Sequence, residues 1–118
     1  MENKPEFIGW WLALAKIGAQ VALLNYNIKQ KGLVHCIKVA NSAAALFDRD
    51  TEENVHAVEG ELNGLKLFYW GGAPQLSFHQ VAAVTHDALL DYSRDDSSFK
   101  ALRQGIKMTD MFGFIYTS

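Results

Sequence analysis

The sequence predicts an α/β fold built on a mostly parallel sheet. Short apolar runs typical of buried strands alternate with amphipathic stretches typical of helices, about twenty residues to each repeat. The chain has 118 residues, enough for one domain, and 49% of them are hydrophobic, which is above the range of disordered chains. Eleven Lys+Arg against thirteen Asp+Glu give a net charge of -2 without a basic stripe, so we do not expect nucleic-acid binding.

The first expected element is a helix over about residues 4–17. Asn3 is the predicted N-cap, and Glu6 three residues later completes a capping box. Pro5 fits the first turn, where a missing N–H does no harm. The stretch is apolar nearly all round, which predicts contacts on more than one side. Gly18 suits the left-handed position that follows a helix, so we expect the helix to stop there.

Residues 7–24 raise the question of a membrane span, because Lys16 is the only charge in this run of eighteen. Lys16 near the centre, Gln20 and two interior glycines oppose a span. We therefore expect a buried helix followed by a buried strand over residues 19–24, with a true span as the alternative. The leader MENKPE is acidic as well as basic, and no small-residue cleavage site follows it, so it is not a signal peptide.

Periodicity predicts the remaining elements. Further strands are expected at 43–47, 65–70 and 112–116, and a turn at 48–50 precedes a charged helix. A fourth helix is expected from a capping box of Ser77 and Gln80. The inward stripes of the second, third and fourth helices are, in order, Leu33, Cys36, Ile37 and Ala40; Val55, Val58 and Leu62; Val81, Val84, Ala88 and Leu89.

The common catalytic and metal-binding motifs do not occur. There is no GxGxxG, no complete GxxxxGK[ST] and no GxSxG. His79 and His86 are seven residues apart, about 10 Å along a helix axis, which is too far to share one zinc ion. Cys36 is the single cysteine and is expected to act as a small hydrophobe. The residues themselves therefore assign no catalytic and no metal-binding side chain.

Two stretches nevertheless resemble a known family. Residues 2–37 agree in spacing with the pattern ENxPEFxxxWLGLAKxGxxxALLNxNxRxxxLxHC. That pattern is close to the early region of the fatty acid transport proteins, also called very-long-chain acyl-CoA synthetases, in the superfamily of AMP-forming adenylating enzymes. Residues 105–118 resemble the segment that runs into YTSGTTGLPK, the phosphate-binding loop of this superfamily. Residues 71–104 carry no distinctive signature.

The resemblance implies that residues 1–118 are a partial AMP-binding (adenylation) domain from the N-terminal subdomain, ending inside the phosphate-loop motif. Tyr116, Thr117 and Ser118 match the first three letters of the motif and are the implied ATP- and AMP-binding residues. The last expected strand has no element after it to cover its second face, which also predicts a truncated chain.

The implied activity of the parent protein is ATP-dependent activation of long-chain or very-long-chain fatty acids to acyl-CoA, coupled to their uptake. ATP, Mg²⁺ and coenzyme A are its implied cofactors, and the isolated piece is expected to bind none of them and to be inactive. Membrane association is implied, at the plasma membrane or endoplasmic reticulum, with the adenylation domain in the cytosol. The oligomeric state stays open.

Two alternatives come from other classes of protein. One is a stand-alone small α/β interaction module that presents Trp10, Trp11 and Trp70 to a partner. The other is a membrane-associated paralogue without catalysis, in which residues 7–24 would span the bilayer and the rest would be cytosolic.

Overall fold

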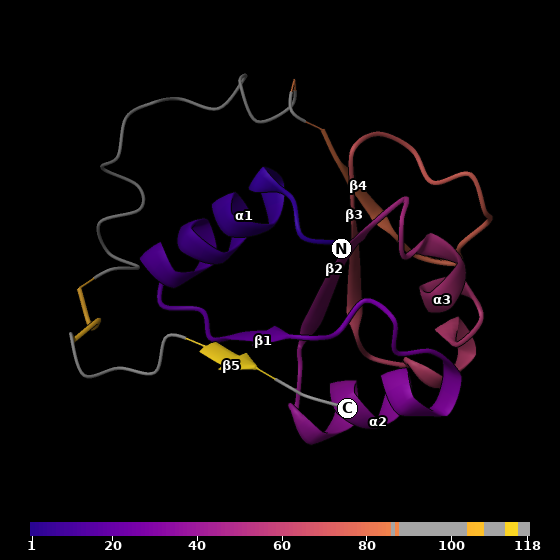
Figure 1. Ribbon diagram of the computed structural model, residues 1–118, viewed down its shortest axis with the longest axis horizontal. Coiled ribbons are helices and arrows are strands. Elements are labelled where there is room, and N and C mark those ends of the chain that lie inside the picture. Colours follow the sequence, from indigo (N-terminus) through magenta and orange to yellow (C-terminus); the bar gives the residue numbers. More distant parts are fainter. Residues whose placement is uncertain (86, 88–103, 108–112, 116–118) are drawn as a thin grey trace.

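The computed structural model describes residues 1–85, 87, 104–107 and 113–115 (Figure 1). Helices alternate with strands along most of the chain, so the predicted α/β class is confirmed. The elements in chain order are α1 (Pro5–Lys16), β1 (Val21–Leu23), α2 (Gln30–Val39), β2 (Ala44–Asp48), α3 (Glu52–His56), the 3-10 turn η1 (Glu59–Glu61), β3 (Lys66–Trp70), β4 (Ala82–Val84) and β5 (Gly113–Ile115).

The described strands form two parallel sheets. One has the order β2-β3-β4, and its central strand β3 pairs with β2 from Ala44↔Lys66 to Asp48↔Trp70. The other pairs β1 with β5, two strands that are distant in the sequence but adjacent in space (Figure 1). Because every pairing is parallel, the carboxyl ends of neighbouring strands meet at a common edge. That edge is where open α/β sheets usually bind ligands.

The hydrophobic core joins α2, α3 and the inward residues of β2 and β3. Side chains of β3 alternate, so that Leu67 and Tyr69 are buried while Lys66 is exposed. Phe47 is 2% exposed and packs edge to face against Tyr69. The predicted inward stripes of α2 and α3 are confirmed, with Cys36 and Ala40 only half-buried; the stripe residues that are buried are Leu33, Ile37, Val55, Val58 and Leu62.

The start of α1 corrects one prediction. The helix begins at Pro5 as expected, but its N-cap is Lys4 and no side chain caps it. The predicted capping box of Asn3 and Glu6 is therefore wrong. A residue before proline is held in the extended region, and Lys4 has φ -145° and ψ 165°. Lys4 must accordingly be the last non-helical residue, which leaves Asn3 one position too early to cap.

The end of α1 confirms the prediction for Gly18. Gly18 has φ +80°, and its N–H donates to the carbonyl of Ala15 at 3.0 Å. The N–H of Ala19 reaches back to the carbonyl of Leu14 at 2.9 Å, which completes a Schellman motif. Residues 7–24 are thus a helix, a turn and a strand. Among the described residues, no helix is both long enough and apolar enough to cross a membrane.

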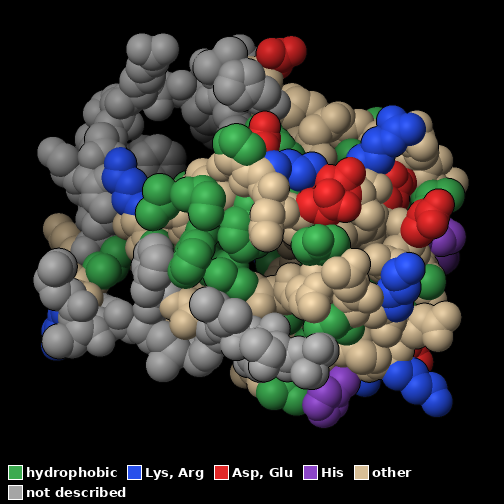
Figure 2. Space-filling view, in the orientation of Figure 1, with side chains coloured by type: hydrophobic (Ala, Val, Ile, Leu, Met, Phe, Trp, Pro, Cys, Tyr) green, Lys and Arg blue, Asp and Glu red, His purple; other side chains and the backbone are tan. Residues whose placement is uncertain are grey.

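The surface of α1 corrects a second prediction. None of its residues is buried, and Ile8 and Leu12 are 49% and 57% exposed. Figure 2 shows hydrophobic side chains gathered on the surface over this helix. The expectation of a buried helix is therefore wrong within the described part of the chain. The expected contacts on more than one side are present, because Trp10 packs on Trp70 and Trp11 lies against Gly113. The main contact of α1 with the larger sheet is the edge-to-face pair of Trp10 and Trp70, whose ring centroids are 5.4 Å apart.

The predicted fourth helix is also wrong at its start. Residues 82–84 form β4, which lies parallel to β3 and pairs Trp70 with Val84. An apolar run this short fits either period, and pairing with the free edge of β3 decides for a strand. Ala88 and Leu89, predicted on the same helix, lie outside the described residues. The expected third helix is divided into α3 and η1.

Two alanine substitutions test the role of the α1 glycines. Gly18→Ala places a Cβ 3.2 Å from Ile106 in a left-handed conformation, and it should lower the free energy of unfolding by about 1–2 kcal/mol. Gly9→Ala meets no atom within 4 Å in a helix interior, and it should raise that free energy by about 0.5–1 kcal/mol. Urea denaturation measures both, and shifts of the same sign would contradict the assignment of the helix end.

Candidate functional site

The predicted phosphate-binding residues Tyr116, Thr117 and Ser118 lie outside the described residues. The strand that precedes them is described, and the expected strand over 112–116 is confirmed at Gly113–Ile115. Leu23 pairs with Ile115, so β1 and β5 end at the same edge. This is the carboxyl edge of a parallel pair, the position where the α/β architecture places ligands.

A second candidate site is a cavity of about 300 Å³ at the carboxyl ends of β2 and β3. Its polar lining comes from the start of α1 and from the turn after β2, and its aromatic lining from the end of β3. Sequence reasoning treated residues 48–50 only as a turn and did not single out a site here. The charged and aromatic residues that line the cavity are Lys4, Glu6, Asp48, Arg49, Tyr69 and Trp70.

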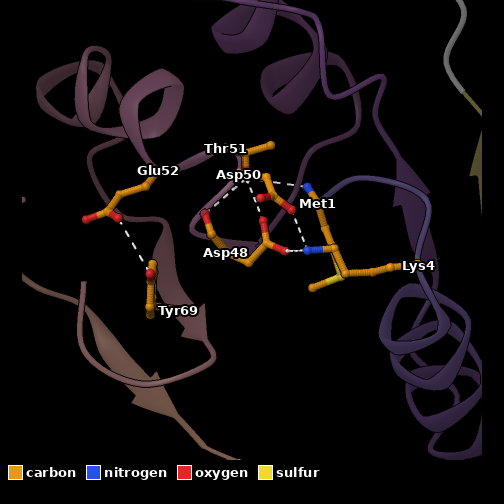
Figure 3. A network of polar contacts seen from close by, with 7 residues as sticks. All are labelled: Met1, Lys4, Asp48, Asp50, Thr51, Glu52 and Tyr69. Atoms are coloured by element: carbon orange, nitrogen blue, oxygen red, sulfur yellow. Dashed lines mark hydrogen bonds and ion pairs between the residues drawn. The ribbon is translucent and has the colours of Figure 1, made fainter. Parts of the chain in front are cut away.

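Two of the lining residues, Lys4 and Asp48, belong to an ion-pair network (Figure 3). The Lys4 ammonium donates to Asp48 Oδ2 at 2.7 Å and also pairs with the Asp50 carboxylate. Asp48 is 3% exposed, and burying a carboxylate is costly unless a cation and hydrogen bonds compensate it. The Thr51 hydroxyl donates to Asp48 Oδ1 at 3.4 Å and accepts from the Met1 amine at the same distance. Asp48 therefore has partners on both carboxylate oxygens.

The network shifts the protonation equilibria of its members. Hydrogen bonds to Asp48 and Asp50 raise the pKa of Lys4, so its ammonium stays charged throughout the ordinary pH range. The hydrogen bond from Lys4 lowers the pKa of Asp50. Burial of the Met1 amine disfavours its charged form, so the pKa of this amine is lowered, in contrast to that of Lys4. The Lys4 ammonium and the Asp50 carboxylate are thus ionised together at neutral pH.

Glu52 is a second buried carboxylate, 3% exposed. Its Oε1 accepts a hydrogen bond of 2.7 Å from the Leu76 N–H, and the Tyr69 hydroxyl lies 3.5 Å from its Oε2 (Figure 3). Burial and the nearby Glu52 charge raise the pKa of Tyr69, so the phenol remains protonated and can donate. Glu52 therefore ties α3 both to β3 and to the loop that follows β3.

Glu52 is one of four side chains that fasten this loop, which we call the α3 ladder. Two of the four lie in α3, one precedes it in the turn after β2, and one begins η1. They bind successive positions of the loop, pairing Arg49 with Gln75, Glu52 with Leu76, His56 with Ser77, and Glu59 with His79. With its amide oxygen toward Arg49, Gln75 accepts from both terminal guanidinium nitrogens, at 3.0 and 3.2 Å. The ladder thereby holds the loop that forms the cavity rim.

The ladder also accounts for two of the histidines. His56 Nε2 lies 3.1 Å from the Ser77 carbonyl, and the Glu59 carboxylate accepts a 2.6 Å hydrogen bond from the His79 N–H. Burial opposes ionisation of Glu59, but the hydrogen bonds from His79 outweigh it and lower the Glu59 pKa. His86 lies outside the described residues. Within the described ranges, no three His, Cys, Asp or Glu side chains are grouped to hold a metal ion.

The Lys4 network has only a weak signal in the sequence. Asp48 ends β2, and a carboxylate at that position points to the ligand-binding edge of a parallel sheet. Its cation is 44 residues away in the sequence, and no local spacing connects the two. Lys4 forms ion pairs with both Asp48 and Asp50, and these pairs fasten the start of α1 to the sheet.

The fold and the β1–β5 edge together define a segment of a parallel α/β protein. Fatty acid transport proteins are among its relatives. The long-chain fatty acid transport protein 1 of Bos taurus is 34% identical over 122 residues, which is 100% of this chain and 18% of that protein. The very long-chain fatty acid transport protein of Saccharomyces cerevisiae is 42% identical over 119 residues, 98% of this chain and 17% of the relative. A protein of the same name from Cochliobolus heterostrophus is 30% identical over 118 residues.

The chain therefore belongs to the fatty acid transport protein family through the segment that it shares with these relatives. The resemblance carried by residues 2–37 and 105–118 is confirmed. This segment spans less than a fifth of the length of the relatives named above. No family model matches the chain, and no solved structure matches it.

Lys4→Met tests the ion-pair network. The substitution leaves the buried Asp48 carboxylate without its cation, so it should lower the free energy of unfolding by about 3–5 kcal/mol at neutral pH. Asp50→Asn is the matched control, because Asp50 is the more exposed partner and its loss should cost under about 1 kcal/mol. Guanidinium denaturation of each variant gives the comparison.

The pKa shifts of Lys4 and Asp50 predict the pH range over which the ion-pair network stabilises the chain. The Asp50 pKa is lowered from 3.8, so its contribution is complete above that value and is lost as the pH falls through the lowered pKa. The Lys4 pKa is raised from 10.5, so its contribution is complete below that value and is lost as the pH rises through the raised pKa. With the amino terminus acetylated in both proteins, so that the Met1 amine does not titrate, the stability difference between the parent chain and Lys4→Met should thus stay constant from about pH 5 to about pH 10. A steady change across that interval would contradict the network.

Proposed function

We propose that this chain is part of the adenylation domain of a fatty acid transport protein that ligates coenzyme A to long-chain or very-long-chain fatty acids. In the first step a carboxylate oxygen of the acid bonds to the α-phosphorus of ATP, and pyrophosphate leaves. In the second step the thiol sulfur of coenzyme A bonds to the acyl carbon, its proton is released, and AMP leaves. Conversion to the thioester would retain the acid inside the cell.

The observation that carries the proposal is the match to the transport proteins along the whole chain, up to the strand that leads into Tyr116, Thr117 and Ser118. Hydroxyl and backbone N–H groups at the carboxyl edge of a parallel strand can hydrogen-bond phosphate oxygens. We assign Thr117 and Ser118 that role. ATP, Mg²⁺ and coenzyme A are the cofactors proposed for the longer protein, in which Mg²⁺ would offset phosphate charge.

We further propose that the longer protein is associated with the plasma membrane or the endoplasmic reticulum, with the adenylation domain in the cytosol. The fatty acids named in the relatives partition into bilayers, so an enzyme that activates them gains by working at that surface. A second candidate function, a small interaction module, is favoured by one observation. The exposed Ile8 and Leu12 side chains give α1 an apolar face that a partner could cover.

A chimera tests the ligase proposal. Residues 1–118 replace the segment of the Saccharomyces cerevisiae relative with which they align, and the chimera is assayed beside that relative. We expect fatty-acid-dependent release of pyrophosphate from ATP, followed by thioester formation. Thr117→Ala and Ser118→Ala should each lower the rate of pyrophosphate release by roughly 100-fold or more, as loss of a preorganised donor does.

Ser77→Ala is the control in the same chimera. Ser77 is exposed, and only its backbone carbonyl takes part in the α3 ladder. The control should therefore retain full activity. A folded chimera that releases no pyrophosphate while the relative does so contradicts the ligase proposal and leaves the interaction module. Full activity in both Thr117→Ala and Ser118→Ala contradicts the roles given to these hydroxyls.

A further inference from the structure

We propose that Trp11 and Gly113 are positioning residues for the ATP-binding step. The Trp11 indole occupies the space that a side chain at position 113 would take, and this close approach sets the position of β5. The inference rests on the proposed function, because the residues assigned to phosphate binding follow β5 directly in the sequence.

Position 113 requires glycine because there is no room for a side chain. A Cβ there would lie 2.8 Å from the carbonyl oxygen of Val21, its partner in β1, and 3.2 Å from Trp11 Nε1. A Cβ essentially never lies within 3.0 Å of a non-bonded oxygen, so the backbone of β1 or β5 would have to shift, and the indole would have to move by a few tenths of an ångström. Gly113 does not have the positive φ of Gly18 or Gly64, so torsion does not explain it. The β1 backbone and the α1 indole together leave no room for a side chain.

The neighbouring tryptophan contacts the other sheet. Residues adjacent in a helix point about 100° apart, so Trp10 and Trp11 cannot face the same surface. Trp10 packs on Trp70 at the end of β3, while Trp11 lies against Gly113 in β5. Phe7, one turn earlier, packs on Trp11 with ring centroids 6.4 Å apart. Helix α1 thereby fixes β5 relative to the sheet that carries the core.

This arrangement makes the position of β5 sensitive to one methyl group. A methyl group at position 113 would have the Val21 carbonyl oxygen on one side and the Trp11 indole on the other. Either β5 or α1 would therefore have to move to make room for it. A shift of about 1 Å in groups that position a substrate can cost roughly 100-fold in rate. The contacts of Thr117 and Ser118 with ATP should therefore weaken, whereas coenzyme A, which enters after the adenylate has formed, should be little affected.

Gly113→Ala in the chimera described above provides the test. We expect the KM for ATP to rise about tenfold with little change in the KM for coenzyme A, because only the group that positions phosphate moves. Amide hydrogen exchange of the peptide that contains residues 113–115 should become faster at the same time. Gly60→Ala is the matched control, since its Cβ would meet no atom within 4 Å, and it should change neither quantity.

Trp11→Phe added to Gly113→Ala provides the rescue. Phenylalanine lacks the indole nitrogen that faces position 113, so one of the two clashes is removed and the contact with Val21 remains. The KM for ATP should therefore return part of the way toward that of the unsubstituted chimera. Such recovery would not occur if Gly113→Ala merely loosened the domain.

The outcomes separate the inference from the function on which it rests. If Gly113→Ala changes neither exchange nor the KM for ATP, the positioning inference is overturned. It is overturned as well if exchange becomes faster in an active chimera while the KM for ATP stays constant, or if the KM values for ATP and coenzyme A rise together. Failure of the proposed function is read from the unsubstituted chimera, which would then release no pyrophosphate.

Discussion

The attachment of helix α1 is the constraint on which the described structure depends. None of its residues is buried, so burial of an apolar stripe cannot by itself hold the helix in place. Three specific contacts act instead: the Lys4 ammonium on buried Asp48, Trp10 on Trp70, and Trp11 against Gly113. An ion pair and two aromatic contacts fix direction better than a nonspecific apolar face does, because each has a preferred geometry.

Specific partners also hold the buried carboxylates beneath the loop after β3. Asp48 and Glu52 are each 3% exposed, yet each carboxylate oxygen of either residue has a partner. A buried polar group left without a partner destabilises a protein by about 1–3 kcal/mol, and more if it is charged. The α3 ladder therefore allows the loop to lie on α3 without strand pairing. The partners come from distant parts of the chain, so the pairs make the domain cooperative and at the same time sensitive to loss of any one member.

Sequence reasoning succeeded where structure is determined locally and failed where it is determined by distant partners. The left-handed residue at Gly18 and the buried stripes of α2 and α3 follow from neighbouring residues, and the structure has both. The N-cap failed because the constraint that Pro5 places on Lys4 outweighs the capping preference of Asn3. The strand at 82–84 could not be predicted because its apolar run is too short to show a period, and only the free edge of β3 selects it. The pairing of Lys4 with Asp48 has no local signal, because the two residues are 44 positions apart.

The carboxyl edges of the two parallel sheets differ in the groups that they offer to a ligand. At the ends of β2 and β3 the Lys4 ammonium already pairs with two carboxylates of the same chain. The cavity beside these charges is bounded by the loop that the α3 ladder holds. A phosphate brought there would meet carboxylates already paired and would have to compete for a cation already engaged. In the β1–β5 pair a glycine at the start of β5 admits the α1 indole, and hydroxyl residues follow β5 in the sequence. Under the proposed function, ATP would therefore bind at the β1–β5 edge, while the ion pairs at the ends of β2 and β3 hold the segment together.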